Sequence, residues 1–309
     1  LSSARAMRED LAGADVAQAN AQEALVKSRA VVNALTVFYR LQALHKQATI
    51  EADALKRLNE AARVVRRRRE EGSASGYDQS RIEIEAELAA STWRRTCTKV
   101  ERLHDGLARS LGKSKDAVRF VGALKSDGAI LPDEKALDSA GTRASLRSLW
   151  TAAQRATQAS QSSYMAWLPD LILSGGPRRS SEHDGEMGYQ VGVSLELPIF
   201  TRGQGISARA SARERYIQAH AEAAERAAGI ERVNASERLR AARKEALRFA
   251  ETTVNQSEVL ERAAQSGYRE GALSIVELLD AQKTRTELEV RQLALALAVK
   301  EAEVAFCAS

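Results

Sequence analysis

Two long runs that lack helix-terminating residues constrain this 309-residue sequence more than any other feature. Residues 2–71 contain no proline and a single glycine, Gly13, and a second long helical pattern covers about 206–268. At about 1.5 Å per residue, each of these helices would reach roughly 90–105 Å. No compact globular domain needs helices of that length, so the sequence predicts an elongated, mainly α-helical protein.

Within the first run, apolar or small residues recur every seven positions. One set has a single polar member, Gln18, and consists otherwise of Leu11, Leu25, Val32 and Tyr39. The companion set consists of Ala14, Ala21, Ser28 and Leu35. This spacing predicts a coiled-coil seam, and its small residues would let a partner helix approach closely.

The composition excludes several classes of protein. Aromatic residues make up 5% of the chain, and with 4 prolines this is too little for a β-sandwich or an α/β enzyme. A net charge of +5 is too small to indicate a nucleic-acid partner. Two cysteines cannot form a disulfide framework or a cysteine-based zinc site, and no run of about 18 apolar residues predicts a membrane-spanning helix.

A short segment between the helical runs has a different periodicity. Apolar and polar residues alternate from Tyr189 to Ile199, which predicts a strand with one apolar face, and a second strand is expected at 168–174. The polar residues 175–185 would form the loop between them. The length of this strand matches a transmembrane barrel strand, although a soluble hairpin fits as well.

The chain also contains an internal repeat. Three residues of one turn recur 199 positions later in a second turn: Gly72, Ser75 and Asp78 correspond to Gly271, Ser274 and Glu277. The glycines predict left-handed helix ends, the serines N-caps, and the carboxylates capping boxes. Capping explains neither Tyr268 nor Asp280.

The repeat predicts two antiparallel helical hairpins with a β-hairpin inserted between them. We expect helices near 3–71 and 206–270 to pair with their successors at 77–111 and 275–306. The corresponding segments are a first-repeat hairpin at 1–112, an irregular stretch and short helix at 113–167, a β-hairpin at 168–200 and a second-repeat hairpin at 201–309.

Several motifs resemble those of TolC-type outer-membrane efflux channels. The second-repeat tip signature of that family is similar to Tyr268-x-x-Gly271-x-x-Ser274-x-x-Glu277-Leu278-Leu279-Asp280-Ala281. Its second strand pair is similar to Leu168-Pro169-Asp170-Leu171 and to 193–200. The heavy-metal (cobalt–zinc–cadmium) branch of the family is most similar in one motif, Pro198-Ile199-Phe200-x-Arg202-x-Gln204-Gly205. The resemblance runs from Leu1 to Phe306, and the first helical segment and first strand pair of the family are expected to precede Leu1.

The resemblance implies a homotrimer with a β-barrel in the outer membrane of a Gram-negative bacterium and an α-barrel tunnel across the periplasm. Such a protein is the passive exit duct of a tripartite efflux system that exports metal ions or small toxic compounds. The implied partners are a periplasmic adaptor, an inner-membrane pump and outer-membrane lipid. Neither a cofactor, a metal site, a nucleic-acid partner nor enzymatic activity is expected.

The resemblance also implies roles for individual residues. Tyr268 matches the gate tyrosine, Glu277 and Asp280 match two acidic ring positions, and Asp78 matches the acidic tip position of the first repeat. Leu273 stands where one member has a gating arginine, and Arg81 occupies the first-repeat counterpart of Asp280. Three copies of Glu277 and Asp280 around one axis would favour cations.

Two other functions fit parts of the sequence. A soluble coiled-coil scaffold or tether would share the heptads, and the same channel fold also serves as the exit duct of type I protein secretion. The cationic run at 66–69 fits either a patch for an anionic partner or a solvated helix end.

Overall fold

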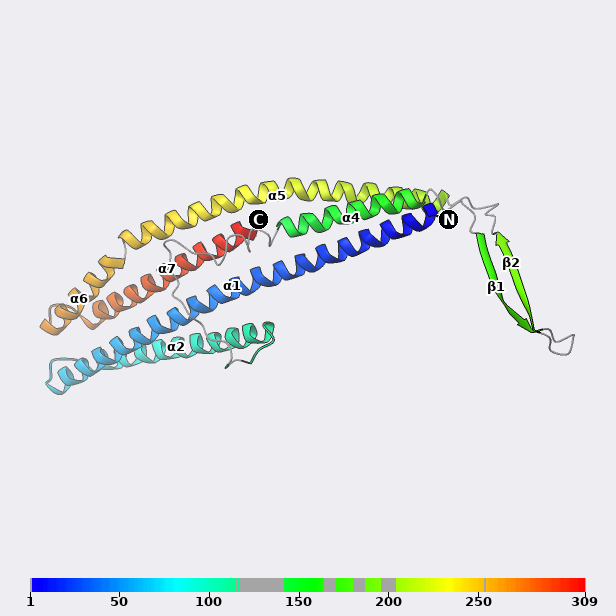
Figure 1. Cartoon of the computed structure of the whole chain (residues 1–309). Coiled ribbons are helices and arrows are strands. Elements are labelled where there is room, and N and C mark those ends of the chain that lie inside the picture. Colours follow the sequence, from blue (N-terminus) through cyan, green and yellow to red (C-terminus); the bar gives the residue numbers. More distant parts are fainter. Residues whose placement is uncertain are drawn as a thin grey trace. The chain divides into compact units, whose positions relative to one another are not determined.

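The computed structural model describes residues 2–114, 116, 142–163, 171–179, 187–195, 204–252 and 254–308. Its elements are α1 (Ser2–Glu70), α2 (Gly76–Ser110), α4 (Thr142–Ser163), β1 (Leu171–Arg179), β2 (Met187–Leu195), α5 (Gln204–Thr252), α6 (Val254–Glu270) and α7 (Ile275–Ala308) (Figure 1). The mainly-α fold with an inserted β-hairpin is therefore confirmed. None of the described helices has a stretch long and apolar enough to cross a membrane.

The long helices agree with the sequence expectation. α1 is continuous over 69 residues. α5 ends at Thr252 and α6 begins at Val254, so the two together cover the range expected for the second long helix, 206–270, apart from residue 253. Residue 253 lies outside the described residues. Most of the expected irregular segment, 117–141, also lies outside the described residues.

The seven-residue seam of α1 is confirmed by burial. Every seam position from Leu11 to Tyr39 is buried or half-buried, and most of the positions between them are exposed. Ala21 and Ser28 are the most buried of the small seam residues, each 6% exposed. Small side chains at these positions let the backbones of neighbouring helices approach closely.

Residue contacts divide the chain into two compact units, Leu1–Leu25 with Arg143–Ala228 and Val26–Thr142 with Gly229–Ser309. In the first unit, α4 binds the start of α1 through an ion pair between Arg155 and Asp15. α4 also contacts α5 through a hydrogen bond, in which the Gln218 side-chain amide of α5 donates to Thr157 Oγ1 of α4 at 3.2 Å. Polar contacts of this kind and small buried residues, rather than large apolar side chains, characterise this unit. Its buried alanines are Ala21, Ala144, Ala153, Ala156 and Ala221.

In the second unit, the helices pair antiparallel within each hairpin. α1 packs on α2 both near the turn, where Val65 and Ile82 share a cluster, and far from it, where Leu41 meets Leu107. α7 likewise packs on α6 near the turn and on α5 farther away, and the distant contact joins Leu239, Ala246 and Val299. The predicted hairpin pairing is therefore confirmed.

The β-hairpin has a register that gathers apolar residues on one face. Leu173 pairs with Val193, and Pro177 pairs with Tyr189. The expected loop at 175–185 is wrong at its start, because β1 continues through Arg179. Pairing with β2 extends the strand past its glycines and through Pro177. The expected strand residues 196–199 lie outside the described residues.

We predict opposite effects for two glycine-to-alanine substitutions. Gly271 has φ of 78°, so Gly271→Ala should lower the free energy of unfolding by about 1 kcal/mol. Gly229 lies inside α5 with open space around its Cα, so Gly229→Ala should raise that free energy by about 0.5–1 kcal/mol. Thermal unfolding in detergent measures both, and equal shifts for the two variants would contradict the argument.

Candidate functional site at the helical turns

The two hairpin turns have the same backbone geometry, as the internal repeat predicts. Gly72 has φ of 75° and Gly271 has φ of 78°. In the first turn, the Ser73 N–H donates to the Arg68 carbonyl at 2.7 Å. In the second turn, the Ala272 N–H donates to the Gly267 carbonyl at 2.8 Å. Both turns are Schellman motifs, in which the left-handed glycine lets the chain reverse and satisfies the last carbonyls of the helix.

The capping boxes are present in both turns. The Asp78 N–H donates to Ser75 Oγ at 3.1 Å, and the Ser75 N–H donates to Asp78 Oδ2 at 3.0 Å. In the second turn, the Glu277 N–H donates to Ser274 Oγ at 3.4 Å, and the Ser274 N–H donates to Glu277 Oε2 at 2.7 Å. The local capping interpretation of these four side chains is therefore correct.

Tyr268 lies in the apolar cluster beneath the turns. It is 5% exposed and packs with residues from all four helices that meet there: Val65, Ile82, Ala264, Ile275, Leu278, Leu279 and Ala281. Burial, together with the negative charge of Asp78, raises the pKa of Tyr268 above the ordinary 10.0, while Arg68 opposes the shift. The structure thus brings the expected gate tyrosine and the first-repeat acid Asp78 into one site.

Arg68 links the two turns, a role that the sequence did not indicate, because there it was only one of the cationic run at 66–69. Its guanidinium donates to the Tyr268 carbonyl, donates to the Ser73 carbonyl at 3.4 Å and lies 5.0 Å from the centre of the Tyr268 ring. We call this set of contacts the Arg68–Tyr268 clasp. Position 68 of the first repeat corresponds to Gly267 of the second. Neither the repeat nor the family signature therefore indicated a role for Arg68. The clasp connects the first hairpin to the second at their turns.

Leu273 makes an apolar contact at the position where the family resemblance led us to consider an arginine link. It packs against the cluster beneath the turns. A Cβ added at Gly267 would lie 2.6 Å from Leu273 Cδ1, so the glycine makes room for the leucine. The cross-hairpin link therefore comes from Arg68 on α1 rather than from position 273.

The two carboxylates after the second turn have different surroundings. The backbone N–H of Ser274 and then its hydroxyl lower the pKa of Glu277 by donating to its carboxylate. Asp280 is exposed and makes no hydrogen bond or ion pair with the described residues. Glu277 is therefore held as a cap, whereas the carboxylate of Asp280 is available to solvent.

The remaining cations near the first turn bind within their own hairpin. Arg66 pairs with Glu83 at 3.2 Å, and the Arg69 guanidinium donates to Gln79 Oε1 at 2.5 Å. Arg81, the counterpart of Asp280, pairs with Glu85 at 3.0 Å. Three of the four arginines at 66–69 therefore have partners inside the protein.

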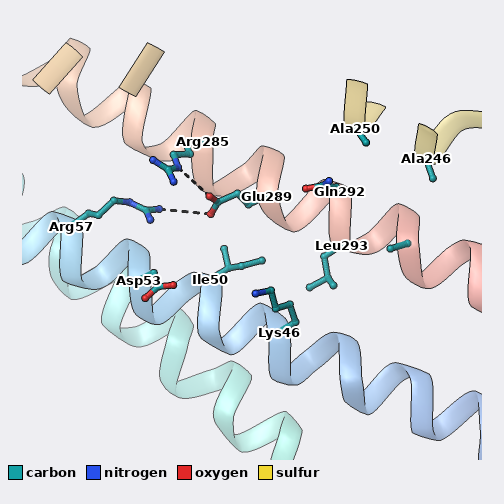
Figure 2. Close-up of a pocket in the computed structure, with 11 residues that line it drawn as sticks. Lys46, Ile50, Asp53, Arg57, Ala246, Ala250, Arg285, Glu289, Gln292 and Leu293 are labelled. Atoms are coloured by element: carbon teal, nitrogen blue, oxygen red, sulfur yellow. Dashed lines mark hydrogen bonds and ion pairs between the residues drawn. The ribbon is translucent and has the colours of Figure 1, made fainter. Parts of the chain in front are cut away.

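A second cross-hairpin contact is a buried ion cluster farther from the turns. Glu261 on α6 is 1% exposed; it pairs with Arg57 of α1 at 3.2 Å and with Arg285 of α7. Glu289 accepts from Arg285 at 3.0 Å and lies 3.8 Å from Arg57 (Figure 2). Removing one member of such a cluster would leave an unpaired buried charge, which is strongly destabilising.

Figure 2 shows three members of this cluster, Arg57, Arg285 and Glu289, which line a hollow between α1, α5 and α7. The volume of the hollow is about 410 Å³. Among the described residues, no three or more His, Cys, Asp and Glu side chains are arranged to hold a metal ion. The region of the turns combines the exposed carboxylate of Asp280, an apolar cluster around Tyr268 and the Arg68–Tyr268 clasp between the hairpins.

We predict that Tyr268→Phe changes the alkaline stability of the protein. The Tyr268 hydroxyl is buried without a hydrogen-bond partner in the described residues, so its removal should cost less than about 1 kcal/mol at neutral pH. The pKa of Tyr268 is raised in the folded state. The contribution of the neutral Tyr268 side chain to the free energy of unfolding is therefore present below pH 10, and it is lost as the pH rises through the folded-state pKa.

Thermal unfolding at pH 7.5 and pH 10.5 checks this prediction. The wild type should lose more stability than Tyr268→Phe at the higher pH, and Tyr77→Phe, which alters a tyrosine that is 65% exposed, should behave like the wild type. The same alkaline loss in Tyr268→Phe as in the wild type would show that Tyr268 does not titrate as described.

Three comparisons with known proteins agree with this geometry. One relative, the cobalt-zinc-cadmium resistance protein CzcC of Cupriavidus metallidurans, is 29% identical over 130 residues. The matched region covers 40% of this chain and 30% of that protein, so the chain spans well under two thirds of its length.

Solved structures match almost the whole chain. The outer membrane protein VceC of Vibrio cholerae has a TM-score of 0.79 at 18% identity, covering 96% of this chain and 73% of VceC. CusC, whose structures are described in connection with transmembrane channel formation, has a TM-score of 0.78 at 17% identity. The match covers 97% of this chain and 73% of the CusC chain. At these identities the likeness establishes the fold alone. The family model for outer membrane efflux proteins matches residues 138–308, more than half of the sequence, and the chain therefore belongs to the outer membrane efflux protein family.

Proposed function

We propose that this protein is a subunit of a passive, trimeric outer-membrane exit duct in a tripartite efflux system. The observation that supports this most is the family match over 138–308 together with the channel fold of nearly the whole chain. A periplasmic adaptor and an inner-membrane pump would supply the cargo and the energy. Metal ions are the first cargo class to test, because the relative CzcC is named for cobalt, zinc and cadmium resistance. Small toxic compounds are the second class.

The β-hairpin supports a position in the outer membrane. Tyr189, Val191 and Val193 lie on one face of β2 and are 91%, 78% and 66% exposed. A soluble scaffold would gain nothing from such an exposed apolar face, whereas lipid would cover it. Two strands cannot close a barrel, so strands from further copies of the chain and from other segments would complete it.

We predict different effects for arginine on the two faces of β2. Val193→Arg would place a charge on the proposed lipid face, at a cost of roughly 2–4 kcal/mol near the bilayer midplane. Ser194→Arg would place it on the opposite, lumen-facing side at little cost. The measurement is the yield of heat-resistant trimers in outer-membrane fractions. Equal loss in both variants would contradict the assignment of faces.

The turns would form the periplasmic constriction of the duct. In this proposal, Tyr268 and Asp78 position the hairpin ends, and the Arg68–Tyr268 clasp holds the two hairpins of one subunit together. Threefold symmetry would bring three copies of Asp280 toward one axis, with Glu277 nearby. Because Asp280 is exposed and unpaired within the described residues, it is the carboxylate best suited to attract cations.

We predict that Asp280→Asn lowers the cation preference of the channel and weakens block by multivalent cations such as cobalt. The substitution removes a charge but no described contact, so trimer assembly should survive. Glu277→Gln combined with Asp280→Asn should reduce selectivity further, with some loss of helix capping from Glu277. Single-channel recording of the complete trimer measures the effect.

The matched control is Glu258→Gln, which removes an exposed acid on α6 before the turn. Its conductance and its block by cobalt should equal those of the wild type. If Asp280→Asn conducts and is blocked like the wild type, Asp280 is surface charge and the proposed cation ring is wrong. A duct that conducts in all variants still supports the channel function itself.

A further inference from the structure

The unit Val26–Thr142 with Gly229–Ser309 contains a second hollow, which shares Arg57 with the ion cluster and Leu279 with the apolar cluster beneath the turns. The hollow has a volume of about 350 Å³ and lies between α1, α2 and α7. Its walls are apolar where Leu58, Leu88 and Leu279 line it. Two polar side chains, Glu51 of α1 and Gln282 of α7, line it as well.

Both of these polar side chains are buried with unused hydrogen-bonding atoms. Glu51 is 6% exposed; its Oε1 accepts from the Gln47 amide at 2.8 Å, but its Oε2 has no partner among the described residues. Gln282 is 4% exposed, and neither Nε2 nor Oε1 has a partner there. Nearly all buried polar groups in proteins are hydrogen-bonded, because an unpaired one is costly. Glu51 Oε2 and Gln282 Oε1 are therefore buried acceptors without a donor among the described residues, and a ligand with N–H groups would supply those donors.

The charge around the hollow selects the kind of ligand. The other ionised side chains of its lining have ion-pair partners: Glu85 pairs with Arg81 at 3.0 Å, Lys283 with Glu287 at 3.9 Å, and Arg57 with Glu261 at 3.2 Å. Glu51 has only the neutral Gln47 amide. A cation is thus the ligand that would satisfy the carboxylate.

We propose that this hollow binds a small primary ammonium compound with an apolar body. Two N–H groups of the ammonium would donate to Glu51 Oε2 and to Gln282 Oε1, and the leucine side chains would cover the apolar body. A metal ion suits the hollow less well, because one carboxylate and one amide are too few ligands to replace its hydration. Asp280 does not line the hollow, and the proposal does not depend on the proposed cation ring.

The test uses the complete protein in detergent and 1-naphthylmethylammonium as the probe, with binding followed by the fluorescence of the naphthyl group. Glu51→Gln and Gln282→Leu should each weaken binding by roughly tenfold or more, as expected for a lost charge-assisted hydrogen bond. The matched control, Glu287→Gln, removes an exposed acid at the same hollow and should change affinity less than about twofold.

Two analogues separate hydrogen bonding from simple hydrophobic or electrostatic attraction. The N,N,N-trimethyl analogue keeps the charge but has no N–H, and 1-naphthylmethanol keeps the apolar body but has no charge, so both should bind several-fold more weakly. The proposal is wrong if the wild type does not bind the probe at millimolar concentration. It is also wrong if Glu51→Gln binds as tightly as the wild type, or if Glu287→Gln weakens binding as much as Glu51→Gln does.

Discussion

Packing between helices along their length is the constraint on which the rest of this structure depends. A helix of 69 residues such as α1 has no compact core to enclose it, so its stability comes from a narrow seam that repeats every seven residues. Small residues such as Ala21 and Ser28 in that seam let neighbouring helices approach closely, and larger ones such as Leu41 and Val65 fill the hairpin interiors.

Polar side chains decide how one hairpin is held to the other within the larger unit. Apolar seams tolerate sliding, because one leucine contact resembles the next, whereas hydrogen bonds and ion pairs fix specific partners. The Arg68–Tyr268 clasp does this at the turns, and the buried cluster of Glu261 with Arg57 and Arg285 does it farther along. Separation of the hairpins would have to break both sets of contacts.

The helical turns and the β-hairpin place different demands on one chain, and the sequence meets them with different chemistry. At the turns, glycine, serine and carboxylate residues end one helix and begin the next within a few residues. In the β-hairpin, alternation puts Val191 and Val193 on one face and Ser194 on the other.

The sequence by itself determined the features that depend on neighbours along the chain. Helix extent, the seam, the glycine turns and the capping boxes could all be predicted, because each rests on residues within about seven positions. Tertiary structure decided the rest. β1 continues through Gly175 and Pro177 because β2 pairs with it, and Arg68 and Glu261 acquire partners 200 and 204 positions away on other helices. No local pattern specifies such pairs, since the geometry that brings their atoms together exists only once the helices have packed.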